Sequence, residues 1–264
     1  MTMIGFIGGG NMAEALIKGM TTEGMKDIMV SEPREERLQE LVRQYGVLAT
    51  QSNSSLVSSC SIIILAVKPQ NMEPVIKEIA AEIDNTKTVV SIAAGITLSY
   101  LQSRLKTDKI VRVMPNTPAL VQEGMSVMSL CECFTGKEIN IVRSIFMSVG
   151  RVMALPERFM DAVTAVSGSG PAFIALFLEA MIDAGCNMGL SRDDAAELAV
   201  QTAVGTAKLL DGGMSPERLR QMVTSPGGTT AAGLKVFEEK GLKNIVSDAL
   251  HAAQNRAQEL GKKA

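Results

Sequence analysis

Short apolar segments alternate with longer segments of helical period through the first half of the chain. The run Ser61–Val67 has almost no polar position, which is typical of a parallel strand that is buried on both faces. Strands are predicted at Ile4–Ile7, Asp27–Ser31, Ser61–Val67, Thr88–Ile92, Lys109–Val113 and Gly124–Leu130, and helices at Met12–Met20, Arg34–Tyr45, Met72–Ala81 and Leu98–Leu105. Strands that alternate with helices in this way predict right-handed βαβ units in a doubly wound sheet.

The pattern changes after Pro156, where strand signals give way to helix starts such as Ser215-Pro216. The helical segment Asp194–Leu210 is rich in Ala and Gly, and such small side chains let helices approach closely, within one chain or between subunits. The predicted class is therefore α/β, with an N-terminal Rossmann domain at residues 1–156. An all-α domain for substrate binding and dimerisation is expected at residues 157–264.

Composition and charge exclude several classes of protein. The 264 residues are 46% apolar and carry a net charge of −2, which is globular and does not favour nucleic acid. The apolar run Ile62–Val67 is too short to cross a bilayer, and the N-terminus does not resemble a secretory signal, so a cytoplasmic protein is expected. A single histidine and four scattered cysteines predict that there is no metal site.

The sequence Gly8-x-Gly10-x-x-Ala13 follows the first predicted strand and opens a helix. In this context Gly8 permits a tight turn, Gly10 lets the backbone approach a pyrophosphate, and Ala13 allows the helix to pack closely on the strand. The helix N-terminus then offers N–H groups and a partial positive charge to the phosphates. The turn predicts a dinucleotide site.

The end of the second strand, Ser31-Glu32-Pro33-Arg34, is expected to meet the adenosine ribose. An acidic residue here favours the 2′-hydroxyl of NAD, whereas Arg and Ser side chains suit the 2′-phosphate of NADP. Glu32 would repel a phosphate, while Ser31 and Arg34 would hold one. This loop therefore leaves the choice of cofactor open.

Other loops follow the predicted strands, at Ala66–Pro69, Ile92–Gly95 and Met114–Pro118. Ligands of doubly wound sheets lie outside the carboxyl ends of the strands, so these loops are expected to face the cofactor. The later loop Thr224–Thr230 precedes a predicted helix, and its glycines and hydroxyls fit a small carboxylate substrate. Turn and cap chemistry alone explains any one of these loops, but it explains the three strand-end loops together less well.

Taken in order, these motifs resemble the pyrroline-5-carboxylate reductase family. They are Gly-Phe-Ile-Gly-Gly-Gly-Asn-Met-Ala, Ala-Val-Lys-Pro-Gln, Val-Ser-Ile-Ala-Ala-Gly, Met-Pro-Asn-Thr-Pro-Ala, Ser-Gly-Ser-Gly-Pro-Ala and Ser-Pro-Gly-Gly-Thr-Thr. The resemblance covers nearly the whole chain and implies reduction of the C=N bond of 1-pyrroline-5-carboxylate to L-proline by NAD(P)H. It implies that the cofactor is usually NADPH, and that two subunits interlock through the helical domain, often as a decamer of five dimers.

The resemblance also assigns roles to residues. Thr230 hydrogen-bonds the imine nitrogen as the catalytic residue. Together with Ser31 and Arg34, the expected cofactor-binding residues are Ile7, Gly8, Gly9, Gly10, Asn11, Met12, Asn53, Ala66, Val67, Lys68, Pro69, Ile92, Ala93 and Ala94. The expected substrate-binding residues are Ser225, Pro226, Gly227, Gly228, Thr229 and Thr230.

The residue inventory agrees with imine reduction, because a protonated cyclic imine is already electrophilic and needs neither a metal nor a strong base. Two alternatives stay open at this point. One is a related imine or 2-hydroxyacid reductase, although oxidation of a hydroxyacid usually needs a Lys or His base and Lys68 is the only candidate. The other is a non-catalytic NADP-binding regulator, which would have no need of Thr229 and Thr230.

Overall fold

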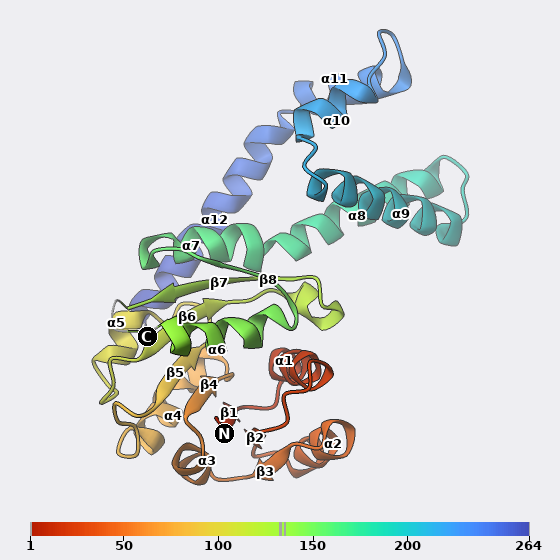
Figure 1. Ribbon diagram of the computed structural model, residues 1–264. Coiled ribbons are helices and arrows are strands. Elements are labelled where there is room, and N and C mark those ends of the chain that lie inside the picture. The colour runs from red at the N-terminus through yellow and green to blue at the C-terminus, as the bar shows by residue number, and fades with distance from the viewer. Residues whose placement is uncertain (1, 132–133, 135, 264) are drawn as a thin grey trace. The chain divides into compact units, whose positions relative to one another are not determined.

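The computed structural model describes residues 2–131, 134 and 136–263 (Figure 1). The chain forms two compact units, one made of Met1–Ser169 with Ala252–Ala264 and the other of Gly170–His251. The first unit contains the sheet, and the second is helical. The predicted fold class, a Rossmann sheet followed by an all-α region, is confirmed.

The strands of the first unit form one sheet in the order β3-β2-β1-β4-β5-β6-β7-β8. Their bounds are β1 Ile4–Ile7, β2 Ile28–Ser31, β3 Leu48–Thr50, β4 Ile62–Leu65, β5 Thr88–Ser91, β6 Ile110–Met114, β7 Gly124–Leu130 and β8 Gly150–Ala154. Neighbours from β3 to β6 are parallel, β7 runs antiparallel to β6, and β8 is parallel to β7. The chain reverses its direction of winding between β1 and β4, where a doubly wound sheet binds its ligand.

Alternate residues of the central strands enter different cores. Phe6 and Ile64 belong to one apolar cluster, and Ile7 and Ile63 belong to the other. The first cluster is completed by α1 (Asn11–Thr22), α2 (Glu35–Tyr45) and α6 (Gly136–Met147), and the second by α3 (Asn53–Ser59), α4 (Met72–Ile79) and α5 (Leu98–Gln102). Burial on both faces explains why these strands have continuous apolar sequences.

The sequence analysis missed β3, β8, α3 and α6. Both strands lie at the edges of the sheet and are partly exposed, so they lack the apolar run that marks a central strand. Helix α3 is a short segment of mostly Ser residues, which have low helix propensity. It forms because the Ser52 side chain accepts a hydrogen bond from the N–H of Ser55 and because Leu56 and Val57 are buried.

The second unit is built from helices, two of which begin at serine caps. They are α8 (Gly170–Asn187), α9 (Arg192–Asp211), α10 (Pro216–Met222), α11 (Thr229–Glu239) and the first part of α12 (Leu242–Lys263). The hydroxyls of Ser191 and Ser215 accept hydrogen bonds at the starts of α9 and α10. A Cβ added to Gly185 would lie 3.0 Å from the Cβ of Ala195, so α8 and α9 pack as closely as the small residues predict.

One helical stretch, Glu157–Asn187, is long and apolar enough to cross a membrane by length and composition. It is longer than the run Ile62–Val67, on which the sequence-based expectation rested. The stretch comprises a 3-10 turn at Glu157–Phe159, α7 (Met160–Val163), a π-helical turn at Thr164–Gly168 and α8. Only 6% of its most apolar window is buried, so most of this apolar surface faces outward.

Candidate cofactor and substrate sites

The turn between β1 and α1 has the backbone that the glycines predict. Gly8 has φ of +101°, and a Cβ there would lie 2.8 Å from the carbonyl oxygen of Ala66. Gly10 is the N-cap of α1, and a Cβ built on it meets nothing within 4 Å. The backbone is therefore tightly packed against Ala66 at Gly8 and open at Gly10, which fits the approach of a pyrophosphate to the start of the helix.

Two adjoining clefts of about 750 and 660 Å³ lie at the carboxyl ends of the strands and share residues of the glycine turn and of the loop after β4. They are lined by all of the predicted cofactor residues except Gly9: Ile7, Gly8, Gly10, Asn11, Met12, Ser31, Arg34, Asn53, Ala66, Val67, Lys68, Pro69, Ile92, Ala93 and Ala94. The predicted set, Gly9 excepted, thus surrounds two adjoining clefts of the first unit.

Glu32 lies at the end of β2 and is only 4% exposed. Its Oε2 accepts a hydrogen bond of 2.9 Å from the N–H of Gly9, and its Oε1 accepts one of 2.7 Å from Nε of Arg34. Burial alone would raise the pKa of the Glu32 carboxyl, but the bonds from Arg34 and Gly9 outweigh it and the pKa is lowered. The site therefore contains a fixed, ionised carboxylate.

Ser31 and Asn53 lie beside Glu32 in the larger cleft. The Ser31 hydroxyl donates to Oδ1 of Asn53 at 2.7 Å, and the Asn53 amide donates to Glu78 at 2.7 Å. This chain of hydrogen bonds fixes the Ser31 and Asn53 side chains in the lining of the larger cleft.

Asn116, in the loop after β6, uses its side chain within the protein. Its Oδ1 accepts from the N–H of Met125 at 2.8 Å, and its amide donates to the carbonyl of Ser167 at 3.2 Å. The sequence analysis considered this loop as a ligand contact, and the hydrogen bonds favour the alternative of turn chemistry. Only Pro115 of this loop lines the smaller cleft.

The predicted substrate loop, Ser225–Thr230, belongs to the second unit, whereas the predicted cofactor residues belong to the first. Gly227 has φ of +70°, and Gly228 is the N-cap of α11. Thr229 is exposed and Thr230 half-buried in the first turn of that helix. The loop thus places backbone N–H groups and hydroxyls together at a helix N-terminus, where an anion is favoured.

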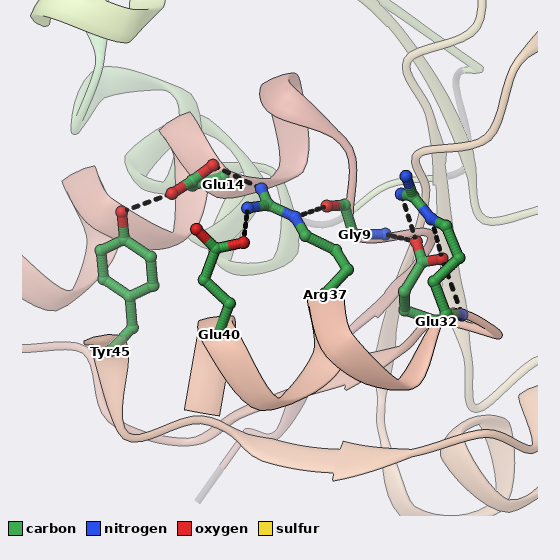
Figure 2. Close-up of polar contacts among 7 residues, drawn as sticks. Gly9, Glu14, Glu32, Arg37, Glu40 and Tyr45 are labelled. Atoms are coloured by element: carbon green, nitrogen blue, oxygen red, sulfur yellow. Dashed lines mark hydrogen bonds and ion pairs between the residues drawn. The ribbon is translucent and has the colours of Figure 1, made fainter. Parts of the chain in front are cut away.

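Sequence reasoning missed Arg37, which lines the smaller cleft. Its Nε donates to the carbonyl of Gly9 at 2.8 Å, and the rest of its guanidinium binds Glu14 and Glu40 (Figure 2). Tyr45 donates to the other oxygen of Glu14 at 2.9 Å. In the sequence Arg37 is one of several charged residues on the polar side of α2, and nothing in the spacing distinguishes it from Arg43.

Family models match both parts of the chain. The model described as "Pyrroline-5-carboxylate reductase dimerisation" matches residues 157–260, and that described as "NADP oxidoreductase coenzyme F420-dependent" matches residues 3–95. The chain is 42% identical to the pyrroline-5-carboxylate reductase of Methanosarcina acetivorans and 40% identical to that of Synechocystis sp., with 98% of each chain covered in both comparisons.

Solved structures agree with these relatives. A pyrroline-5-carboxylate reductase from Coxiella burnetii is 37% identical with a TM-score of 0.92, and 98% of both chains is covered. The Plasmodium falciparum pyrroline carboxylate reductase with NADP bound is 32% identical with a TM-score of 0.88, again with 98% of both chains covered.

Proposed function

The chain belongs to the pyrroline-5-carboxylate reductase family, and we propose that the clefts beside its glycine turn hold the dinucleotide while Ser225–Thr230 hold the substrate. The reaction is the reduction of the C=N bond of 1-pyrroline-5-carboxylate to L-proline, the last step of proline biosynthesis. The open space beside Gly10 at the start of α1 is the observation that best supports the cofactor site.

In this proposal the residues bind and orient the reactants. NAD(P)H supplies the hydride that is transferred to the C=N carbon. The first turn of α11 holds the substrate carboxylate through its N–H groups, and the hydroxyl of Thr230 hydrogen-bonds the imine nitrogen. The small side chains of Ala93 and Ala94 leave room beside the smaller cleft for a flat nicotinamide ring.

Thr230 is tested through its hydroxyl. Thr230→Ala is expected to lower kcat/KM by about 5- to 150-fold, which corresponds to about 1–3 kcal/mol for one hydrogen bond that forms in the reacting complex. Thr230→Ser retains the hydroxyl and should stay close to the wild type. Wild-type kinetics in Thr230→Ala would remove Thr230 from the mechanism.

The geometry around Glu32 supports a preference for NADH, although the resemblance implies NADPH. A ribose 2′-hydroxyl can donate to the Glu32 carboxylate, whereas a 2′-phosphate would bring a second negative charge next to it. Arg34, whose side chain is 67% exposed, would have to leave Glu32 to bind that phosphate. The enzyme is proposed to use both cofactors, with the higher kcat/KM for NADH.

Initial rates with NADH and NADPH test this preference. Glu32→Ser is expected to move the ratio of the two kcat/KM values towards NADPH by about tenfold or more, because it removes the repulsion. The bond from Gly9 to Glu32 is lost with either cofactor, so the ratio reports only how the 2′ position is recognised. An unchanged ratio would exclude Glu32 as the specificity residue.

The exposed apolar surface of the second unit supports a homodimer, and the proposed location is the cytoplasm. The large apolar residues that are at least one-third exposed on α8 and α9 are Phe173, Ile174, Leu176, Phe177, Met181, Leu198, Val200, Val204 and Leu209. A bilayer is a poor partner for this surface because α8 also carries Glu179 and Asp183, which are costly in hydrocarbon. A second copy would cover it instead, and the resemblance extends this dimer to a decamer.

A further inference from the structure

We infer that Arg37 is a positioning residue, which holds the glycine turn in the conformation that binds the pyrophosphate. The inference rests on the proposed cofactor site, and it adds a residue that touches the turn from outside. Arg37 comes from the first turns of α2, and its Nε donates to the carbonyl oxygen of Gly9 at 2.8 Å. Figure 2 shows its guanidinium between Gly9 and the carboxylates of Glu14 and Glu40.

The turn is fixed on both sides of Gly9. Its N–H donates to Glu32 at 2.9 Å, and its carbonyl accepts from Arg37. The N–H of Gly8 is fixed as well, because it donates to the carbonyl of Ser31 at 2.8 Å. Successive peptide groups of the turn thus have protein partners before any ligand arrives.

The bond to the Gly9 carbonyl determines where the next N–H points. In a trans peptide the C=O and the N–H lie on opposite sides, so a carbonyl held by Arg37 directs the N–H of Gly10 away from Arg37. Gly10 lines both clefts, and the space beside it is open. Without this bond the peptide between Gly9 and Gly10 could rotate, which would present a carbonyl oxygen to the phosphates and withdraw a donor.

Arg37 is itself held in place by its carboxylate partners. One terminal nitrogen bonds Glu14, and the other bonds Glu40 at 2.7 Å. Glu14 is fixed in turn by the hydroxyl of Tyr45 at 2.9 Å. Burial would raise the pKa of Glu14, but the bonds from Arg37 and Tyr45 outweigh it and lower the pKa, so the carboxylate that orients Arg37 stays ionised.

These carboxylates also argue against direct phosphate binding by Arg37. Each of the three guanidinium nitrogens has a partner on the protein, the side chain is only 16% exposed, and its charge is balanced by Glu14 and Glu40. An arginine that binds a phosphate directly would direct its terminal nitrogens at the ligand. Here the terminal nitrogens bond Glu14 of α1 and Glu40 of α2, so Arg37 lines the smaller cleft without directing either of them at a ligand.

The test compares ADP and adenosine as competitive inhibitors against NADH. Both occupy the adenosine half of the site, but only ADP carries the pyrophosphate. Arg37→Met keeps the apolar stem and removes the donors. It is expected to raise the inhibition constant of ADP and the KM for NADH by about tenfold, with the adenosine constant, kcat and the KM for the imine unchanged within about twofold.

Control variants separate the possible failures. Arg43→Met changes an exposed arginine of the same helix and should leave every constant at the wild-type value. Gly10→Val fills the open space beside the turn and should raise the inhibition constant of ADP strongly. If Gly10→Val raises this constant and Arg37→Met does not, the role of Arg37 is overturned and the cofactor site stands. If neither variant raises it, the cofactor site itself is wrong.

A structural role for Arg37 gives a different result. In that case Arg37→Met would weaken the binding of adenosine and ADP alike and would raise the KM for the imine, which would overturn the inference.

If Arg37→Met does not fold, Glu14→Gln replaces it, because loss of the Glu14 charge loosens the hold on the Arg37 guanidinium. That variant should weaken ADP relative to adenosine by about threefold, and an unchanged ratio would overturn the inference equally. Arg37→Lys, which keeps a donor, is expected to restore most of the ADP affinity.

Discussion

The two compact units of this chain bury their apolar residues to very different extents. In the first unit large side chains such as Phe6, Ile64 and Phe146 are fully buried in clusters on both faces of the sheet. Within Gly170–His251 only Gly185, Ala195 and Ala199 are buried. The first unit closes its core within one chain, while the second leaves most of its apolar surface uncovered.

This difference shows that an apolar sequence does not reveal what covers it. In the first unit the central strands have a neighbour on either side and helices on both faces, so the chain itself buries its apolar residues. Helices α8 and α9 pack closely at Gly185 and Ala195, and the residues that they bury are small. The proposed homodimer would cover the rest, in line with the dimerisation model that matches residues 157–260.

The largest effect is expected from a variant that disrupts the proposed subunit interface of the second unit. Ile174 and Leu176 are 61% and 64% exposed on α8. Replacing both with Asp would bury two unpaired charges in the interface, and each is expected to destabilise the dimer by about 3–5 kcal/mol. The variant is expected to be monomeric by light scattering and to lose most of its activity.

The matched control is Leu48→Asp, because Leu48 is 51% exposed on the edge strand β3 of the first unit. This variant should keep the wild-type mass and activity. If Ile174→Asp/Leu176→Asp also kept the wild-type mass, α8 would not be the subunit interface.

A second prediction compares one buried and one exposed phenylalanine. Phe146 is fully buried in the first unit, so Phe146→Ala should destabilise the fold by about 3–5 kcal/mol at any protein concentration. Phe177 is 45% exposed, with its ring 6.3 Å from that of Phe237. The loss of stability in Phe177→Ala should depend on protein concentration, because this substitution weakens the association of subunits.

Thermal unfolding at low and high protein concentration checks this contrast. Equal concentration dependence in the two variants would contradict the division into a closed core and an interface.

Much of the first unit could be predicted from the sequence, because a central parallel strand needs apolar residues on both faces. Gly8 is another local signal, since its positive φ and its close approach to Ala66 leave no room for a side chain. Edge strands such as β8 carry no such requirement and were missed. Most of the predicted cofactor residues follow predicted strands whose carboxyl ends meet, whereas Asn53 follows the missed strand β3 and came only from the family resemblance.

The residues that hold the turn could not be predicted, because their partners are far away in the sequence. Glu32 was recognised for its effect on a 2′-phosphate, but its bond to Gly9 joins residues 23 positions apart. Arg37 reaches Gly9 across 28 positions, and Tyr45 reaches Glu14 across 31. Charged residues on a helix face are usually solvated, so only the fold distinguishes these from their neighbours.

The smallest expected effect concerns alkaline stability of the first unit. Burial and the bond to Glu14 raise the pKa of Tyr45 from 10.0 to about 12, and burial raises the pKa of Cys60 from 9.0 to about 11. A group with a raised pKa gives its full stabilisation below its unfolded pKa and loses it as the pH rises through the folded value. For Cys60 this window is about pH 9–11, and for Tyr45 about pH 10–12.

Tyr45→Phe should therefore begin about 1 kcal/mol less stable near neutral pH, because the bond to Glu14 is lost. It should then lose less stability than the wild type as the pH rises from about 10 to 12, since it has no phenol to ionise beside Glu14. Cys60→Ala should remove the part of the stability loss that begins near pH 9. Urea unfolding at a series of pH values measures both, and any general alkaline loss cancels when variants are compared with the wild type. Parallel curves for all three proteins would show that neither group resists ionisation in the folded first unit.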